Sequence, residues 1–106
     1  MGYVYLICDP SNDMFKIGVT RGSIDKRIKK LQTGNSHELF ISDTFETPWP
    51  FRLETLLHNH FKSKHILNEW FALDAHDVSH FHEICCRLEN NIRILSNNPF
   101  FGKDLK

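Results

Sequence analysis

The sequence predicts one α+β domain in which helices flank a small antiparallel or mixed β-sheet, in the order β-β-α-β-α-β-α. Two runs near the N-terminus, residues 3–8 and 14–20, are rich in the β-branched and aromatic residues that favour strands. Three later segments place apolar residues at intervals of three and four, which is the spacing of an amphipathic helix. The 106 residues of the chain suffice for one hydrophobic core and not for two.

The first two runs are expected to form a hairpin, because the turn-forming residues 9–13 separate them. Side chains alternate between the two faces of a strand. Tyr3 and Tyr5 therefore share one face of the first strand, and Lys16 and Gly18 share one face of the second. Polar groups are thus expected to gather on one face of the sheet.

A helix is expected to follow, with Ser23 as its cap and Gly34 at its end. Its apolar positions recur at helical spacing: Ile24, Ile28 and Leu31. Arg27 neighbours all three on the helix surface, so its side chain is expected to emerge at the edge of the buried stripe.

The second half of the chain supplies the remaining elements. Pro48 and Pro50 break the chain before a helix, and Asp74 can cap the last one. The domain is expected to span residues 1–96, followed by an irregular tail over 97–106. Its later elements are a strand over residues 39–45, a helix over 51–61, a short strand over 68–73 and a helix over about 75–96.

The charges exclude a wholly basic protein that coats nucleic acid, because thirteen basic and thirteen acidic side chains cancel. Their distribution is uneven. Residues 1–35 carry six basic side chains against three acidic ones, whereas residues 36–60 carry one against four. A basic region beside an acidic one suits a phosphate held over a metal ion.

The chain start and the cysteines predict a compartment. The start has neither the basic region nor the cleavage site of a secretory signal, and no segment approaches the roughly 18 consecutive apolar residues of a membrane span. The cysteines form no CxxC pair and are odd in number: Cys8, Cys85 and Cys86. We therefore expect a cytoplasmic protein, or one in the nucleus or viral factory of a eukaryotic host, that is not secreted and contacts no membrane.

Five features stand in a fixed order along residues 2–73. They are Tyr3-Val4-Tyr5, Lys16-Ile17-Gly18, Arg27, Glu54 and Asn68-Glu69-Trp70-Phe71. In their order and spacing the chain resembles the GIY-YIG nuclease superfamily. It is most similar to the short branch, common in phages, large viruses and bacteria, whose second triplet reads KIG. The resemblance covers about two thirds of the chain.

The resemblance implies hydrolysis of DNA phosphodiester bonds with one divalent metal ion, Mg²⁺ or Mn²⁺. The family's metal ligand falls on Glu54, its helix arginine on Arg27 and the tyrosine of its first triplet on Tyr5. Lys16 stands where much of the superfamily has a tyrosine proposed as the general base, so either Tyr5 or Lys16 is expected to act as the base. Further residues expected to bind the DNA are Tyr3, Gly18, Arg21, Lys26 and Lys30.

The chemistry of phosphodiester hydrolysis agrees with these assignments. A hard cation on a non-bridging oxygen needs a carboxylate such as that of Glu54. Charge that builds up on the phosphoryl oxygens is best met by a guanidinium, which cannot lose its proton, and Arg27 supplies one.

Structural interpretations stand beside the functional ones. Tyr5 could fill the core, Lys16 could only bind backbone phosphate, and Asn68 could be a turn residue rather than a brace for the site. His58 lies one helical turn after Glu54 and could add a ligand or carry protons. A rival metal site would consist of His76, His80 and Glu83 on the last helix.

The sequence is compatible with three functions. The first is a metal-dependent endonuclease that acts on DNA; the alternative is a degenerate module of the same fold that binds nucleic acid without cutting it. The third is a protein-interaction module that uses the helix face of Phe81, Leu88 and Ile92. The sequence holds no appended zinc finger or helix-turn-helix, so a homodimer or a protein partner is expected to supply specificity.

Overall fold

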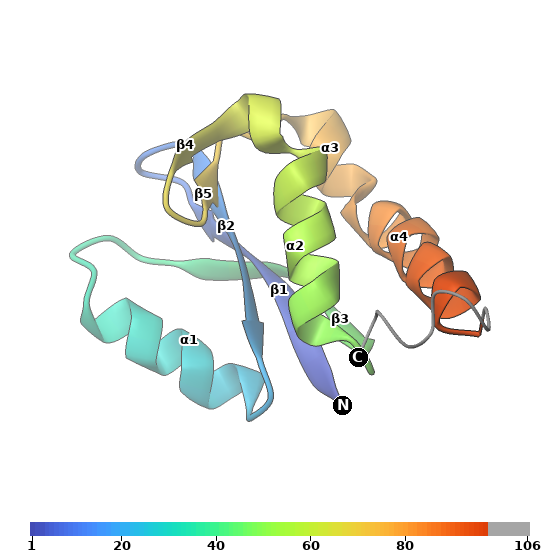
Figure 1. Ribbon diagram of the computed structural model, residues 1–106. Coiled ribbons are helices and arrows are strands. Elements are labelled where there is room, and N and C mark those ends of the chain that lie inside the picture. The colour runs from blue at the N-terminus through green and yellow to red at the C-terminus, as the bar shows by residue number, and fades with distance from the viewer. Residues whose placement is uncertain (98–106) are drawn as a thin grey trace.

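One antiparallel sheet with the strand order β3-β1-β2-β5-β4 organises the molecule, in the computed structural model that describes residues 1–97 (Figure 1). The predicted fold class is confirmed. In chain order the elements are β1 (Gly2–Asp9), β2 (Met14–Thr20), α1 (Ile24–Thr33), β3 (Phe40–Thr47), α2 (Pro50–His60), the 3₁₀ turn η1 (Lys62–Lys64), β4 (His65–Leu67), β5 (Trp70–Phe71), α3 (Ala75–Ser79) and α4 (Phe81–Ser96).

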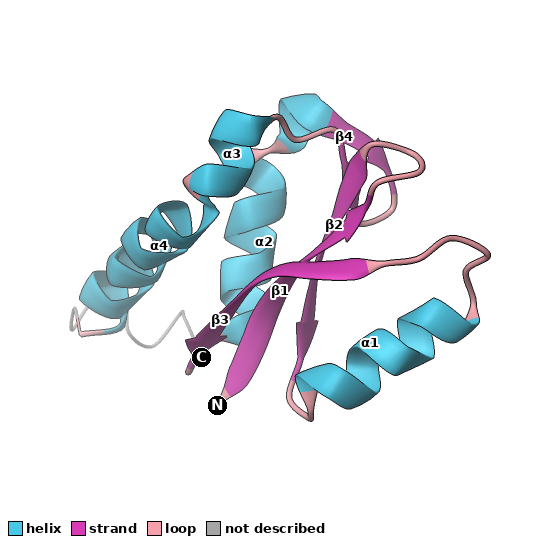
Figure 2. Cartoon of the chain, turned by 180° about the vertical axis from the view of Figure 1, so that it is seen from behind, coloured by secondary structure: helices cyan, strands magenta, loops and turns pink. Residues whose placement is uncertain are grey.

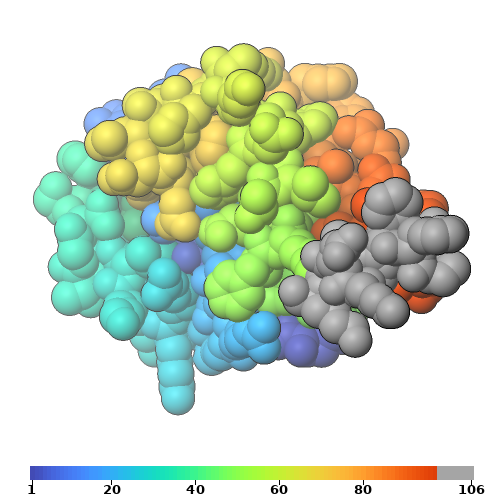
Figure 3. Space-filling model, in the orientation of Figure 1, coloured from blue at the N-terminus to red at the C-terminus, as the bar shows by residue number. Residues whose placement is uncertain are grey.

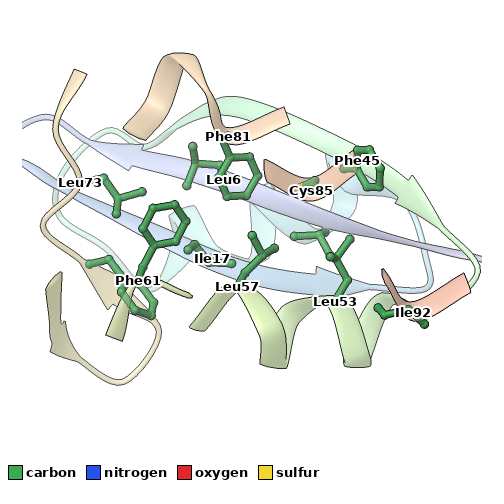
Figure 4. Packing of buried hydrophobic residues seen from close by; sticks show 12 residues of the cluster. Leu6, Ile17, Phe45, Leu53, Leu57, Phe61, Leu73, Phe81, Cys85 and Ile92 are labelled. Carbon is green, nitrogen blue, oxygen red and sulfur yellow. The ribbon is translucent and has the colours of Figure 1, made fainter. Parts of the chain in front are cut away.

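Helices lie on both faces of the sheet (Figure 2). The larger core forms against α2 and α4, where Leu6 and Ile17 of the sheet pack with Leu53, Leu57 and Phe81 (Figure 4). The opposite face carries a smaller cluster that α1 covers. Its members are Tyr5, Ile7 and Leu39, packed against Ile24, Ile28, Leu31 and Trp70.

The first hairpin forms as predicted. Tyr5 pairs with Gly18 and Ile7 with Lys16, so these side chains share the face that α1 covers. The predicted start of α1 is also confirmed, because the Ser23 side chain accepts a hydrogen bond from the Lys26 backbone N–H at 3.3 Å.

The predicted single strand over residues 68–73 is wrong in its extent. The structure has a short hairpin instead, in which β4 and β5 pair across a turn that contains Asn68 and Glu69. Asn68 has a φ of 52°, which is the left-handed conformation that an asparagine tolerates in turns. The sequence does not reveal β4, because its three residues are all exposed and leave no buried pattern.

The predicted last helix is divided into α3 and α4 at His80. Asp74 caps α3, as predicted, through a reciprocal pair of hydrogen bonds with Asp77. At the break, Ser79 Oγ donates to the His76 carbonyl at 3.0 Å and His80 Nδ1 lies 2.9 Å from the same oxygen. The predicted irregular tail lies outside the described residues, except for Asn97.

Within residues 1–97, no helix combines the length and the apolar character that a membrane crossing requires. The three cysteines are free, with Cys85 buried and Cys86 exposed.

Candidate nuclease site

The predicted site residues meet beside β2, where the β4–β5 hairpin turns away from it. Within the described chain β5 pairs with β2 at Phe15 and Lys16, and the next residue, Ile17, donates its backbone N–H to the Glu69 carbonyl at 3.0 Å. The Ile17 carbonyl faces α2 and lies 2.9 Å from His58 Nε2. The pairing of β2 with β5 therefore ends at Ile17, and α2 lies beside β2 from this point.

Arg27 and Tyr5 form the first part of the site. Arg27 Nε donates a hydrogen bond to the Tyr5 hydroxyl oxygen at 3.2 Å. This hydrogen bond, followed by the partial charge of the same oxygen, raises the pKa of Arg27 further above its usual range. Tyr5 is only 1% exposed, so its hydroxyl contacts the guanidinium from the buried side and limits its movement.

Gly18 makes room for this arrangement. A Cβ atom at Gly18 would lie 2.4 Å from the Tyr5 hydroxyl oxygen and 2.5 Å from the adjoining ring carbon. Real Cβ atoms do not approach so closely, so glycine is needed opposite Tyr5. The structure thus gives the glycine of the second triplet a packing role.

Lys16 and Glu69 form an ion pair across the same edge. Lys16 Nζ donates to Glu69 Oε2 at 2.6 Å and lies 5.7 Å from the centre of the Trp70 ring. Burial alone would raise the pKa of Glu69, but the hydrogen bond and positive charge of Lys16 lower it below its usual value.

Glu54 projects from α2 toward these groups. Its side chain is 18% exposed, and its Oε2 atom is buried without a hydrogen bond from any described residue. Burial, and then the neighbouring Glu69 carboxylate, raises the pKa of Glu54 to about 7, although Lys16 and Arg27 oppose this shift. A buried carboxylate beside another carboxylate is a position that a cation would stabilise.

The donor atoms fit a divalent metal ion. Glu54, His58 and Glu69 each offer one ligand atom, and these atoms lie within 4.8 Å of one another. The Ile17 carbonyl can only accept a hydrogen bond, so His58 Nε2 donates to it, and only Nδ1 of that ring is left for a metal. Glu54 Oε2 accepts no hydrogen bond from the described residues and lies 4.0 Å from His58 Nε2, so it is the atom best suited to hold the ion.

The basic residues expected to bind DNA lie around this centre in different ways. Lys26 and Lys30 line a shallow hollow of about 230 Å³ beside Arg27. The Arg21 guanidinium lies 5.2 Å from the Phe51 ring, at the start of α2. In Figure 3, blue atoms of the first strands are visible between the cyan atoms of α1 and the green atoms of α2.

A comparison with known families decides the membership of the chain. The profile of the T5orf172 domain matches residues 2–86, which are 85 of its 106 residues. The chain belongs to the T5orf172 domain family. T5orf172 domains occur in phage and related nuclease-like proteins. No curated protein and no solved structure gives a significant match.

Two of the predicted site residues of this T5orf172 domain lie apart from the centre. Tyr3 pairs with Glu46 of β3, and a hydrogen bond to that carboxylate raises the pKa of Tyr3. Asn68 contributes its backbone, since its carbonyl oxygen lies 2.7 Å from His65 Nε2 and its φ marks the turn. The turn interpretation of Asn68 is therefore the one that the geometry favours.

The rival metal site on the last helix does not assemble. His76 and His80 lie in α3 and at its end, where His80 Nδ1 is 2.9 Å from the His76 carbonyl oxygen. Among residues 1–97, the one group of three potential ligands close enough to share an ion is that of the T5orf172 site, and Glu83 is not part of it.

Glu69 is the site residue that sequence reasoning did not assign. It stands inside the final motif, whose aromatic residues predict a strand and whose asparagine predicts a turn, and neither feature predicts a role for the carboxylate. The available signal was the position of a charged residue between a turn asparagine and the core residues Trp70 and Phe71. Its partner Lys16 is distant in sequence, so the ion pair becomes evident only once the strands are paired.

Proposed function

We propose that this T5orf172 domain is a metal-dependent endonuclease that hydrolyses DNA phosphodiester bonds. The observation that carries the proposal is the convergence beside β2 of Arg27, Lys16 and a buried Glu54 oxygen that accepts no hydrogen bond from the described residues. Two cations and a carboxylate facing one another suit a phosphate held over a metal ion. The GIY-YIG-like motifs and the nuclease-like context of the family support the same activity.

Glu54 would hold Mg²⁺ or Mn²⁺, which when bound acts as a Lewis acid on the phosphate. Arg27 donates to the phosphoryl oxygens, where negative charge develops, and Tyr5 keeps its guanidinium in place. Lys16 supplies a second fixed positive charge for the phosphate. Because Tyr5 is buried beneath Arg27, we assign it a base-assisting role and not that of the base itself.

The DNA would lie across the basic side of the molecule. Lys26 and Lys30 on α1 would contact the phosphate backbone next to the scissile bond, and Arg21 would do so at the end of β2. Such contacts position the duplex without reading its sequence. A homodimer or a protein partner would therefore supply specificity.

The direct test is cleavage of supercoiled plasmid with Mg²⁺ or Mn²⁺, with a chelator as control. We expect nicking that the chelator stops and that Glu54→Gln abolishes, while folding and weak DNA binding persist. Glu83→Gln, which removes an exposed carboxylate of α4, is the matched control and should cut like the parent protein. Full activity of Glu54→Gln would refute the assignment.

A second candidate function is a binding module that holds DNA without cutting it. The observation in its favour is Lys16, which replaces the superfamily's proposed base and is engaged by Glu69. In that case the purified protein would retard DNA in a gel, leave plasmid intact with either metal, and bind equally well after Glu54→Gln.

A further inference from the structure

The turn that carries Glu69 is fixed on both sides. The Asn68 carbonyl oxygen lies 2.7 Å from His65 Nε2 on β4. The Glu69 carbonyl accepts a hydrogen bond from the Ile17 backbone N–H of β2 at 3.0 Å. The left-handed φ of Asn68 sets the direction in which the next residue leaves the turn. The Glu69 side chain is therefore presented to the edge of β2 from a constrained backbone.

That side chain holds the Lys16 ammonium. The contact between Nζ and Oε2 is 2.6 Å, the Lys16 side chain is only 12% exposed, and the Trp70 ring lies close to Nζ. A free lysine side chain samples many rotamers, and ordering it costs conformational entropy. With Glu69 and Trp70 in place, the ordering of the Lys16 side chain is already complete before a phosphate binds.

We propose that Glu69 is a positioning residue that acts through Lys16, holding its ammonium at the place where the scissile phosphate binds, beside Arg27 and Glu54. The inference rests on the proposed nuclease function. The cost of removing two charges from water offsets much of the attraction within a part-buried ion pair, so stability alone is a weak reason to place a second carboxylate next to Glu54. Preorganisation of a cation is a stronger reason, because misplacing a catalytic group by about 1 Å can cost roughly 100-fold in rate.

A double-mutant cycle tests the pathway through Lys16. Glu69→Gln should lower kcat for plasmid nicking by about 10- to 100-fold. The KM for DNA should stay level or fall, because a carboxylate that repels phosphate is removed. In a Lys16→Met background, adding Glu69→Gln should change kcat less than about twofold, since the residue through which Glu69 acts is gone. If the two losses multiply, Glu69 acts independently of Lys16 and the inference is wrong.

A charge exchange separates positioning from a purely structural ion pair. The double variant with Lys16→Glu and Glu69→Lys restores an ion pair between the two elements but moves the cation off β2. Its thermal midpoint should recover toward that of the parent protein, whereas its cleavage should stay as low as that of Lys16→Met. Recovery of both properties would show that the pair is only structural and would overturn the inference.

Two controls keep the inference apart from the proposed function. Arg93 forms an ion pair with Glu89 within α4, so Arg93→Met should alter stability without altering kcat. Glu54→Gln decides the nuclease function, because full cleavage by that variant would refute it. If Glu54→Gln is inactive while Glu69→Gln cuts at the parent rate, the inference fails and the proposed function stands.

Discussion

Among the glycines of residues 1–97, Gly18 leaves the least room for a side chain. It faces Tyr5 across the first hairpin, and Tyr5 in turn accepts the hydrogen bond of Arg27. A side chain at Gly18 would therefore displace the tyrosine and, through it, the guanidinium of the site. The absence of a side chain at Gly18 therefore allows Tyr5 to hold the Arg27 guanidinium in its observed position.

Gly18→Ala is expected to lower the free energy of unfolding by about 1–3 kcal/mol, the usual cost of overpacking, and to reduce cleavage. Gly22→Ala is the matched control, because its Cβ would lie 3.8 Å from the nearest atom, Thr20 Oγ1. Urea unfolding followed by circular dichroism measures both variants. Equal stability of the two would show that Tyr5 yields without cost.

Arg27→Lys keeps the positive charge but loses the planar array of donors. We expect kcat for cleavage to fall by about 100-fold or more while DNA affinity changes little. Lys29→Arg, at an exposed position of α1 with no assigned contact to DNA, should leave kcat unchanged. Parallel losses of affinity and rate would make Arg27 a binding residue.

Glu54 is expected to couple the stability of the protein to pH. Its pKa is raised in the folded protein to about 7 from 4.5, so the folded state binds more protons than the unfolded state between these values. Stability should therefore fall as pH rises from about 5 to 8 in the presence of chelator. Glu54→Gln should make the stability less dependent on pH over this range. Added Mg²⁺ should restore stability at pH 8 in the parent protein but not in Glu54→Gln. Denaturant midpoints at pH 5 and pH 8 provide the measurement.

At the level of elements, local sequence signals predict the first hairpin, α1 and α2 well. Ser23 and Gly34 mark the ends of α1, and Pro50 marks the start of α2, because caps and prolines act within a few residues. The β4–β5 hairpin and the break at His80 escape prediction. Both depend on contacts made by polar side chains and turn backbone, which apolar periodicity does not record.

Asp74 joins the hairpin region to α3. It caps α3, and its carboxylate also lies 3.3 Å from Lys64 Nζ. Asp74→Ala should lower the midpoint of urea unfolding more than Asp74→Asn, because asparagine retains the cap. The backbone hydrogen bond from Asp77 and the charge of Lys64 lower the pKa of Asp74, so its contribution should be present at neutral pH and lost as pH falls below about 4. A stability advantage of the parent protein over Asp74→Asn that persists at pH 2.5 would contradict this.

Over the whole molecule, the neutral net charge conceals a basic side formed by α1 and the end of β2. The sequence reveals this asymmetry and most of the candidate site, because Tyr5, Arg27 and Glu54 stand in a motif. It does not reveal which of them touch. The hydrogen bond of Arg27 to Tyr5 and the pairing of Lys16 with Glu69 join segments 22 and 53 residues apart, and only the folded sheet specifies them.

The basic side is expected to govern the salt dependence of DNA binding. Lys26→Met and Lys30→Met should each reduce the slope of log affinity against log salt by about one. Arg87→Met, on α4 at the other face of the sheet, should leave the slope unchanged. Fluorescence anisotropy with a labelled duplex between low and moderate salt measures all three. An equal effect of Arg87→Met would mean that DNA binds without a preferred side.

The short β5 has one more consequence. Had β5 begun two residues earlier, at Asn68, a regular ladder would have continued along β2, and main-chain partners would have replaced His58 at the Ile17 carbonyl. The candidate site thus lies where β2 loses its pairing with β5, between α2 on one side and the turn at residues 68–69 on the other. A change in the length of the turn at residues 68–69 would move Glu69 relative to α2 without replacing a residue of the core, so the spacing of the candidate site depends on the length of one turn.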